Sequence, residues 1–309
     1  MNTIKKLNNK DFEFFFKVKI NKILNKEIIN SNLSYREINI KEYFYYINDL
    51  INITFNQKYI LSGNKYKKKW ENGWGYNFKI LKKKKNINSL IPGYSDKFRI
   101  AQVKNRLIKT VTKNFLFKAQ KIILSFIFDK YLKKFKYIVE FGTGTGHNLV
   151  ALYKKDTSKF FYGLDWSSSS EKIFKLLKKK YPKIFFRKFN FFNPKNNLQF
   201  KKNLWSGFTF GALEQVGYKY KKFFHFLQKT NPGIVVHLEP IEELLNKDNL
   251  LDNLSINYIE KRNYLRGYLD FLKEKEKKNI IKIISIRKSY FGDFRIKAFS
   301  LIVWKFNKK

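Results

Sequence analysis

The sequence has no cysteine among its 309 residues. Disulfide bonds and thiolate metal sites are therefore excluded. It also has no apolar run long enough to span a membrane, because the longest candidate, 122–128, is short and is interrupted by Ser125. The N-terminal residues do not show an apolar signal core followed by a cleavage site of small residues. We therefore expect a cytoplasmic protein without a membrane span.

Acidic residues are scarce: 24 Asp and Glu stand against 65 Lys and Arg, which gives a formal net charge of +41. An excess of this size suggests a polyanionic partner such as a nucleic acid. However, 57 of the basic residues are lysine and only 8 are arginine, the residue type that recognition of phosphate and guanine favours. The excess is also nearly equal in 1–134 and 135–309, at +21 and +20. We therefore favour a bias of the whole composition and keep a nucleic acid as the less favoured partner.

The apolar content is sufficient for a folded core, since 44% of the residues are hydrophobic and 18% are aromatic. Two regions differ in their sequence pattern. Residues 1–134 lack glycine-rich loops and predict a mainly helical region, with apolar residues at helical spacing over 97–134. Residues 135–309 predict alternating strands and helices. We interpret the first region as a cap or lid over a binding site in the second.

Within 135–309, short apolar segments alternate with helical patterns. Strands are predicted at 137–141, 160–164, 184–189, 205–210 and 233–238, and a long helix at 255–278. Two closing strands, 280–286 and 297–304, are joined only by a loop that holds Gly292, so the last strand should run antiparallel. The predicted fold class is α/β: a Rossmann-like, mostly parallel, seven-stranded sheet with an antiparallel last strand, next to the mainly helical N-terminal region.

The strongest motif is a glycine-rich turn between the first of these strands and the helix that follows it. It reads Glu140-Phe141-Gly142-Thr143-Gly144-Thr145-Gly146. Its glycines allow a tight turn, a close approach of the backbone to a ligand, and packing of the helix on the sheet. His147 stands where a dinucleotide fingerprint needs its last glycine, which disfavours NAD and FAD, and no phosphate-loop lysine follows. The acidic residue at the strand end suits a ligand with a positive charge.

A second signal lies at the end of the next strand. Asp165 follows Gly146 by 19 residues, and a carboxylate there can accept hydrogen bonds from both ribose hydroxyls of an adenosine. Trp166 comes next and could pack on the adenine. Each piece has a plainer interpretation, because a glycine-rich turn is often only a turn and Asp165 could cap the following helix. The ordered combination favours an adenosine-bearing ligand.

Residues 137–305 resemble the class I methyltransferases that use S-adenosylmethionine (SAM), and in particular an uncharacterised bacterial subgroup of them. Residues 140–146 are similar to the first motif of that family and Asp165 to its second. The segments 212–216 and 231–236 resemble those after the fourth strand and before the fifth, and the closing strand pair fits as well. The resemblance implies SAM as the cofactor. The cofactor-binding residues that it implies are Glu140, Gly142, Thr143, Gly144, Gly146, Asp165, Trp166, Asn190 and Phe191.

One position departs from the family pattern. Asn190 stands at the end of the third strand, where the family usually has an acid that binds the adenine amino group. Because the asparagine side-chain oxygen can also accept a hydrogen bond from that amine, we expect cofactor binding to persist.

Candidate catalytic residues follow the fourth and fifth strands. In a doubly wound sheet ligands bind at the carboxyl ends of the strands, so Glu214, His237 and Glu239 could line the acceptor pocket, with His237 or Glu214 as a general base. In the alternative interpretation, His237 is a hydrogen-bonded core histidine and Glu239 a cap. Less favoured is a Mg²⁺ site built from the three, so we assign no metal. On the catalytic hypothesis, His237→Ala lowers turnover and leaves SAM affinity nearly intact.

Candidate acceptor-binding residues come from both regions. Trp70, Trp74 and Arg106 could form a lid, and Arg266 could grip an anionic acceptor. The alternatives are ordinary packing for the tryptophans and an ion pair with Glu260 or Asp270 for the arginine. The sequence therefore favours a SAM-dependent methyltransferase with a small-molecule acceptor, for example a sugar or related metabolite. An RNA or DNA methyltransferase and a non-catalytic SAM-binding protein are the alternatives.

Overall fold

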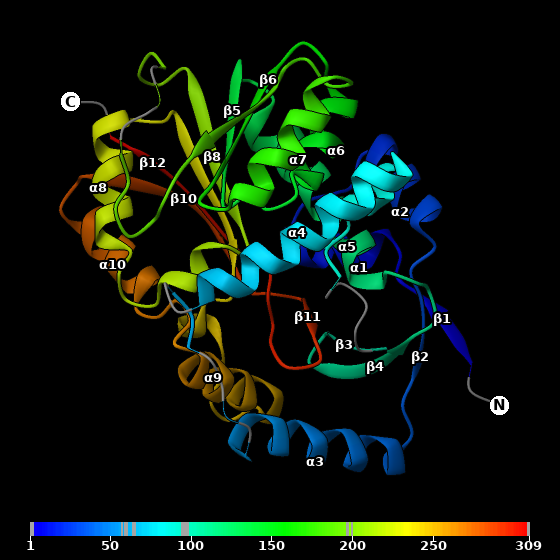
Figure 1. Cartoon of the computed structure of the whole chain (residues 1–309). Helices are drawn as coiled ribbons and strands as arrows, with labels where there is room; N and C mark the ends of the chain where they lie inside the picture. The colour runs from blue at the N-terminus through cyan, green and yellow to red at the C-terminus, as the bar shows by residue number, and fades with distance from the viewer. Residues whose placement is uncertain are drawn as a thin grey trace.

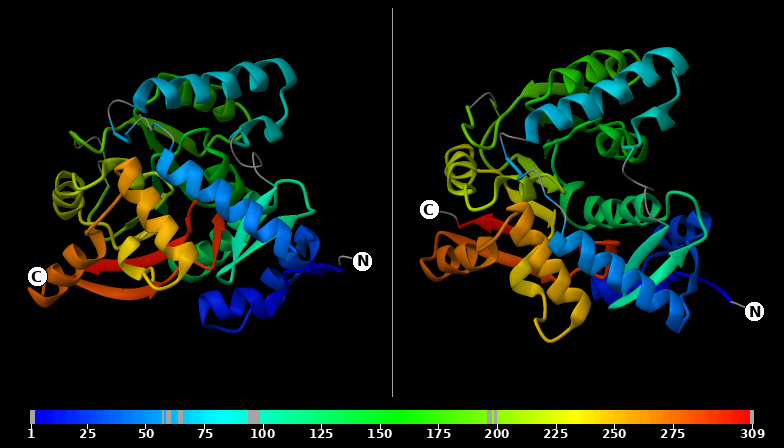
Figure 2. Two further views of the ribbon diagram at one scale, coloured as in Figure 1. Left: turned by 90° about the horizontal axis from the view of Figure 1, so that it is seen from below. Right: turned by 60° about the horizontal axis from the view of Figure 1, so that its bottom comes forward.

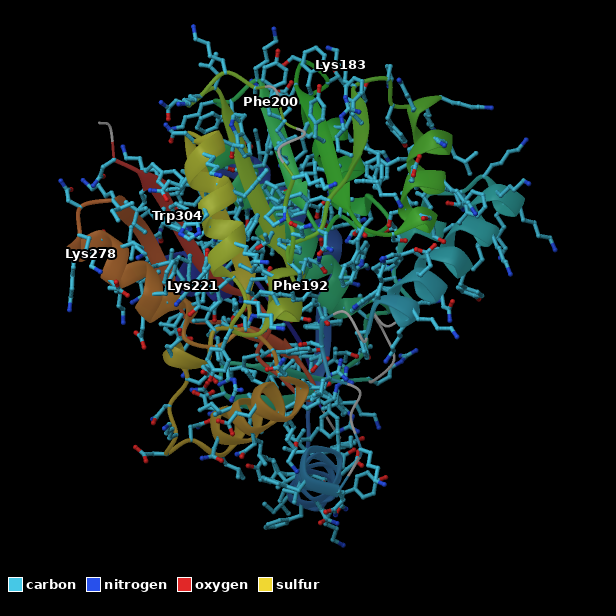
Figure 3. All side chains as sticks on the ribbon, turned by 60° about the vertical axis from the view of Figure 1, so that its left-hand side comes forward. Lys183, Phe192, Phe200, Lys221, Lys278 and Trp304 are labelled. Atoms are coloured by element: carbon cyan, nitrogen blue, oxygen red, sulfur yellow. The ribbon has the colours of Figure 1, made fainter. Side chains whose placement is uncertain are left out.

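The computed structural model describes residues 3–56, 58, 61–63, 66–93, 99–195, 198 and 200–307. These residues form two sheets, one of seven strands and one of five, with helices around them (Figure 1). Lysine side chains project from widely separated parts of the surface, as Lys183 and Lys278 show in Figure 3. Within the described residues, no helix is both long enough and apolar enough to cross a membrane.

The larger sheet has the predicted Rossmann-like form. Its strands are β5 (Tyr137–Phe141), β6 (Phe160–Asp165), β7 (Ile184–Lys188), β8 (Trp205–Phe210), β9 (Ile234–Glu239), β10 (Ile281–Arg287) and β12 (Ser300–Phe306). They lie in the order β10-β12-β9-β8-β5-β6-β7. Strands β5 to β9 pair in parallel, whereas β12 is antiparallel to both β9 and β10. The predicted mostly parallel, seven-stranded sheet with an antiparallel last strand is confirmed.

Helices cover both faces of this sheet because the side chains of each strand alternate between the faces. Ile138 belongs to the core cluster formed with α5 (Phe115–Ile127), α6 (His147–Lys155) and α7 (Ser168–Lys178). Its neighbour Val139 belongs to the cluster on the opposite face, formed with α8 (Lys221–Thr230) and α10 (Tyr268–Lys277). Figure 1 shows α6 and α7 on one side of the strands and α8 and α10 on the other.

The prediction of one long helix over 255–278 is wrong. The chain forms two helices there, α9 (Leu250–Arg262) and α10, with an irregular stretch between them. Asn263 and Gly267 both have positive φ angles, of 52° and 68°, which end one helix and precede the next. The side chains of α10 therefore face the sheet independently of those on α9. Helix α9 packs instead beside α3 (Ile40–Asn56) (Figure 2).

The N-terminal region contains helices but also a second sheet that the sequence analysis did not predict. The helices before α5 are α1 (Asn9–Phe16), α2 (Lys22–Ser31), α3 and α4 (Lys67–Lys84), with the short η2 (Ile87–Leu90), and η3 (Phe128–Leu132) follows α5. The strands are β1 (Ile4–Lys6), β2 (Ser34–Glu37), β3 (Ile100–Val103), β4 (Arg106–Thr110) and β11 (Phe291–Asp293), in the order β1-β2-β4-β3-β11. All their pairings are antiparallel.

The helical prediction for 97–134 is therefore wrong in its first part. Residues 100–110 form the hairpin of β3 and β4, which turns at Lys104 and Asn105 with positive φ angles of 51° and 60°. Residue 97 and its neighbour 98 lie outside the described residues. Strand β11 comes from the region 135–309 and pairs with β3, so one sheet joins the two predicted regions. The functional division at residue 134 stays a prediction.

Helix α4 connects the N-terminal region to the large sheet by packing against α7 (Figure 1). Its Glu71 caps the start of α7: Oε2 accepts a hydrogen bond from the N–H of Ser168 at 2.9 Å, and Oε1 accepts from the N–H of Ser169 at 2.8 Å. Oε1 also accepts from the Ser169 hydroxyl at 2.6 Å. A carboxylate is favoured at a helix N-terminus because unpaired N–H groups point outward there. This cap fixes α4 above the carboxyl ends of β5 and β6.

Candidate functional site

A cleft of about 780 Å³, a volume that includes its open mouth, lies where β5, β6 and β8 end. The strand order reverses here, because the chain proceeds outward from β5 to β7 on one side and returns on the other side at β8. Such a switch point is where open α/β sheets bind their ligands. Nine of the residues predicted to bind cofactor or acceptor line the cleft: Glu140, Gly142, Thr143, Gly144, Asp165, Trp166, Phe191, Trp70 and Trp74. Their roles in binding remain predictions.

The glycine-rich turn forms the base of the cleft. The N–H groups of Gly142 and Thr143 both donate to the carbonyl of Leu164, at 2.7 and 3.1 Å, which holds the turn against β6. Gly142 has a φ of +76°, and a Cβ there would lie 2.3 Å from the Cβ of Ala212. A side chain is therefore excluded, so the loop after β8 can approach the turn closely. Gly146 lies outside the cleft lining and caps the start of α6.

Asp165 links the turn to the end of β6. Its Oδ2 accepts from the N–H of Gly144 at 2.8 Å, and its Oδ1 accepts from the N–H of Ser167 at 2.9 Å. The side chain is buried, and this burial raises the pKa of Asp165 to about 6, although the backbone hydrogen bonds oppose the rise. A carboxylate offers about four acceptor positions, so Asp165 can still accept from two hydroxyls of a ligand.

Glu140 lies beneath the turn and is also buried. Its two oxygens accept from the Thr143 hydroxyl and the Asn148 amide, both at 2.7 Å. Burial raises the pKa of Glu140 to about 8, so much of the carboxyl is neutral near pH 7. A cationic group in the cleft would favour the ionised form, which gives this site a preference for ligands that bear an ammonium group.

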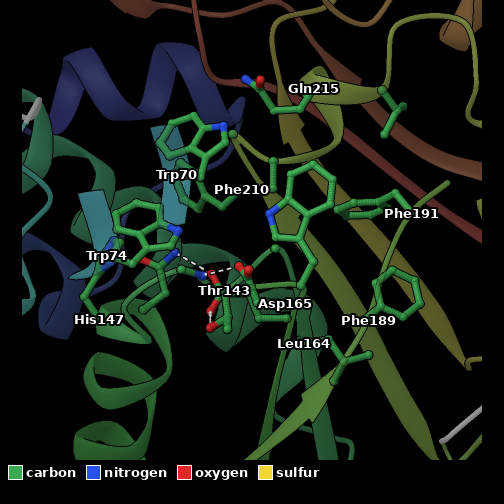
Figure 4. Close-up of a pocket in the computed structure, with 18 of the residues that line it drawn as sticks. Trp70, Trp74, Thr143, His147, Leu164, Asp165, Phe189, Phe191, Phe210 and Gln215 are labelled. Atoms are coloured by element: carbon green, nitrogen blue, oxygen red, sulfur yellow. Dashed lines mark hydrogen bonds between the residues drawn. The ribbon is translucent and has the colours of Figure 1, made fainter. Parts of the chain in front are cut away.

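Two aromatic walls face each other across the cleft. On one wall Trp70 and Trp74 stack at 5.3 Å between ring centroids. On the other wall Trp166 stacks with Phe192 at 6.1 Å, and Phe191 lies beside them. Figure 4 shows the Trp70–Trp74 pair opposite Phe191, with Asp165 and Thr143 at the base. A flat heterocycle such as adenine fits between faces of this kind.

Asn190 does not line the cleft. Its Oδ1 accepts from the N–H of Phe192 at 2.9 Å, which closes a local Asx turn after β7. The side chain thus acts on the backbone that carries Phe191 and Phe192. The contact with an adenine amino group stays a prediction, and in this structure the side chain helps to place the aromatic wall.

His237 is buried in the core and does not reach the cleft. Its Nδ1 lies 2.9 Å from the hydroxyl of Thr209, and its Nε2 lies 2.9 Å from the hydroxyl of Tyr268. Burial lowers the pKa of His237 to about 3, so the ring stays neutral at physiological pH. Both ring nitrogens already have partners, and no substrate atom can approach them. The hypothesis of a catalytic base at His237 is wrong, and the alternative of a hydrogen-bonded core histidine describes its placement.

Glu239 and Glu214 do not line the cleft either. Glu239 is fully buried and accepts from the N–H groups of Ala212 and Leu213, both at 3.1 Å, and of Glu214 at 3.0 Å. It therefore caps the short helix η4 (Leu213–Val216) after β8 and positions the cleft residues on it. Burial and the charge of Glu239 raise the pKa of Glu214 to about 8, and its Oε1 accepts from Gln215 at 2.8 Å. Within the described residues, no three His, Asp or Glu side chains are grouped to hold a metal ion.

The two predicted arginines also lie away from the cleft. Arg106 is exposed at the start of β4, with Nη1 at 3.8 Å from Glu37. Arg266 makes the ion pair with Glu260, at 3.5 Å, that was the alternative interpretation of this residue. Its guanidinium also lies 4.7 Å from the ring centre of Tyr218. Neither arginine is placed to grip a ligand beside Asp165.

Several cleft residues were missed because no local motif marks them. They are Gln120, His147, Asn148, Leu164, Phe189, Phe192, Phe210, Gly211, Ala212, Gln215 and Val216. His147 is the one with a recognisable signal, since it directly follows the glycine-rich turn. Its Nδ1 lies 3.0 Å from the hydroxyl of Thr145, which donates to the carbonyl of Leu90 at 2.7 Å. The Thr145 oxygen must then accept from His147, so Nδ1 carries the proton and Nε2 is left as an acceptor.

No known protein-family model matches this chain, and no curated protein matches it. Among solved structures it is similar to the CurJ carbon methyltransferase, with 10% identity and a TM-score of 0.42 over 62% of this chain and 54% of that one. It is also similar to the methyltransferase domain of bacterial CtHen1-CN, with 16% identity and a TM-score of 0.44 over 62% and 99% of the two chains. An O-methyltransferase family protein from Burkholderia thailandensis gives 8% identity and a TM-score of 0.46 over 63% and 58%. The chain thus spans little more than half the length of the first and third of these proteins. The Rossmann-like fold itself follows from the strand order and pairing described above.

Proposed function

We propose that this chain is a SAM-dependent methyltransferase that acts on a small-molecule acceptor. The observation that carries the proposal is the arrangement of Asp165 and the glycine-rich turn at the switch point of the large sheet. The Asp165 carboxylate accepts from the Gly144 N–H and remains open to further donors at the base of the cleft. This is the position from which an acid at the second strand end binds a ribose.

The residues present fit the cofactor in three respects. The aromatic walls offer flat faces to an adenine, Asp165 provides acceptors for a ribose, and Glu140 favours an ammonium group. Because Gly142 has no side chain, the loop after β8 can lie directly against the glycine-rich turn at Ala212. When bound, SAM supplies a methyl group that its sulfonium makes electrophilic.

The chain's own contribution is to bind, to orient and to exclude water. The Trp70–Trp74 pair covers one side of the cleft, and Glu71 fixes the helix that carries it. A reacting pair held in line and shielded from water needs little further activation when the methyl group is already electrophilic. Gln120, His147 and Gln215 are polar groups on the cleft lining that can orient an acceptor. An acceptor of metabolite size, such as a sugar, suits a cleft that α4 covers on one side.

The proposal is tested by calorimetric titration with SAM and with S-adenosylhomocysteine, its demethylated product. We expect both to bind with one site per chain, and Asp165→Ala to abolish binding while the protein stays folded by circular dichroism. Asp270→Ala is the matched control, because it removes an exposed acid on α10 whose ion pair is with Lys273 at 3.4 Å. If neither ligand binds to the folded wild-type protein, the cleft serves another ligand and the proposal is overturned.

A further inference from the structure

We infer that a second cavity, lined by lysines and next to the cofactor cleft, binds a small molecule that carries a phosphate group. This cavity of about 1280 Å³, including its open mouth, lies between α2, η2, α5 and α6. It shares only His147 with the lining of the first cleft. The inference therefore concerns a separate site and does not rest on the proposed methyl transfer.

The cavity gathers positive charge that the protein neutralises only in part, since Glu27 also lines the cavity. Four of its lining residues are lysines: Lys118, Lys121, Lys154 and Lys155. Only Lys155 has acidic partners, with its Nζ at 2.8 Å from Glu27 and 3.6 Å from Asp129. Throughout the described part of the chain, no carboxylate lies within 4.0 Å of the other three ammonium groups. Three unpaired cations around one cavity are complementary to a ligand with more than one negative charge.

All three lysines line the same cavity, Lys118 and Lys121 from α5 and Lys154 from α6. Partial removal from water lowers the pKa of Lys121, and the charges of Lys154 and Lys118 lower it further. The Nζ of Lys118 donates a hydrogen bond to the carbonyl of Ser31 at 3.1 Å. The Nζ of Lys121 lies 4.7 Å from the ring centre of Phe117. A bound dianion would relieve the repulsion among the lysines and draw the pKa of Lys121 back up.

The rest of the lining indicates the size and nature of the ligand. Apolar side chains from η2 and its end, Ile87, Leu90 and Ile91, line the same cavity as the lysines. A phosphate at the lysines would thus carry an organic group against an apolar wall, as in a phosphorylated metabolite or a mononucleotide. The cavity is bounded by four elements, so it suits a compact ligand better than an extended polymer.

The test uses the full-length protein and inorganic pyrophosphate as the probe, titrated calorimetrically at about 0.15 M salt, where weak surface attraction is screened. We expect one saturable site per chain and at least a fivefold loss of affinity in Lys121→Gln and in Lys154→Gln. Lys229→Gln on α8 is the matched control, because it removes the same charge on the opposite face of the large sheet. It should leave the affinity unchanged within about twofold.

The outcomes separate a built site from the general attraction of a chain with a charge of +41. Equal weakening in the control and in the cavity variants, or binding that does not saturate, would overturn the inference. Binding of a single-stranded oligonucleotide without binding of pyrophosphate would also overturn it and indicate a polymer surface. Far-UV circular dichroism of Lys121→Gln and of Lys154→Gln shows whether each variant is folded, whatever pyrophosphate does.

Discussion

Acidification is expected to weaken cofactor binding through the protonation of Asp165. Burial raises the pKa of this carboxyl to about 6, well above the usual range for an aspartic acid. Only the ionised form can accept from two ribose hydroxyls while it holds the N–H groups of Gly144 and Ser167. The proton and the ribose therefore compete for the same oxygens, and affinity should fall as the pH drops through about 6.

The size of the expected loss of affinity follows from the titration of Asp165 alone. At about pH 5, one pH unit below the pKa, about one tenth of the protein has an ionised Asp165, against nearly all of it at about pH 8. If the protonated form binds weakly, affinity for S-adenosylhomocysteine falls about tenfold over this range. Glu140 adds a smaller dependence at the alkaline end, because its pKa lies at about 8 and its ionised form favours the ligand's ammonium group.

Calorimetric titration with S-adenosylhomocysteine across this pH range measures the effect, and this ligand avoids turnover. Asp165→Asn separates the contributions of Asp165 and Glu140, since it removes the pH dependence that Asp165 causes near pH 6 and keeps the one that Glu140 causes near pH 8. We expect weaker binding in this variant and no further loss between about pH 7 and about pH 5. A wild-type affinity that is flat over that interval, in protein shown to be folded at both ends, would refute the assignment of Asp165 to the ribose.

Three further predictions concern how the site is supported. Glu71→Gln weakens the cap on α7, so we expect the free energy of unfolding in urea to fall by about 1 kcal/mol. The affinity for S-adenosylhomocysteine should also fall, and an unchanged affinity would show that α4 does not shape the cleft. His237→Ala should cost at least about 2 kcal/mol of unfolding free energy and leave that affinity unchanged within about twofold; a large loss of affinity would contradict its structural role. Asp252 is buried and pairs with Lys288 and Lys297, so Asp252→Asn should lower the free energy of unfolding by about 3–5 kcal/mol. A loss below about 1 kcal/mol in thermal unfolding would argue against a buried ion pair.

The large sheet could be predicted from the sequence because its signals are local. Each of the strands β5 to β9 is a short apolar segment, and helical patterns or turns separate them. The glycine-rich turn and Asp165 then mark the ends of two neighbouring strands, so the base of the cleft follows from chain order alone. The topology rule for parallel sheets places these ends at one edge, and the structure shows them there.

The smaller sheet could not be predicted in the same way. Its strands are three to five residues long, too short for a period of two to stand out from the surrounding sequence. One of them, β11, pairs with β3 although Phe291 and Val103 are far apart in the sequence. Pairings of this kind depend on the tertiary fold and leave no pattern within either segment.

The error at His237 has a specific cause in strand geometry. A histidine near the end of the fifth strand suggests a site, but its role depends on the face toward which it points. Its register partner on β8 is Thr209, and the two side chains meet on the face that α10 covers. Tyr268 fills that space only because α10 begins after the break at Gly267, which the sequence pattern did not separate from α9.

The position of α4 determines how far the cleft is covered. The motifs in 135–309 alone would leave the cleft open on the side that Trp70 and Trp74 now cover. A Cβ on Gly144 would lie 2.8 Å from the Trp74 indole, so the indole packs directly on the turn that carries the site. The same helix caps α7 through Glu71, and α7 follows directly from the strand that ends in Asp165. The N-terminal region is therefore a structural part of the cleft, and contacts from that region, rather than the strand-end motifs, shape the side that Trp70 and Trp74 cover.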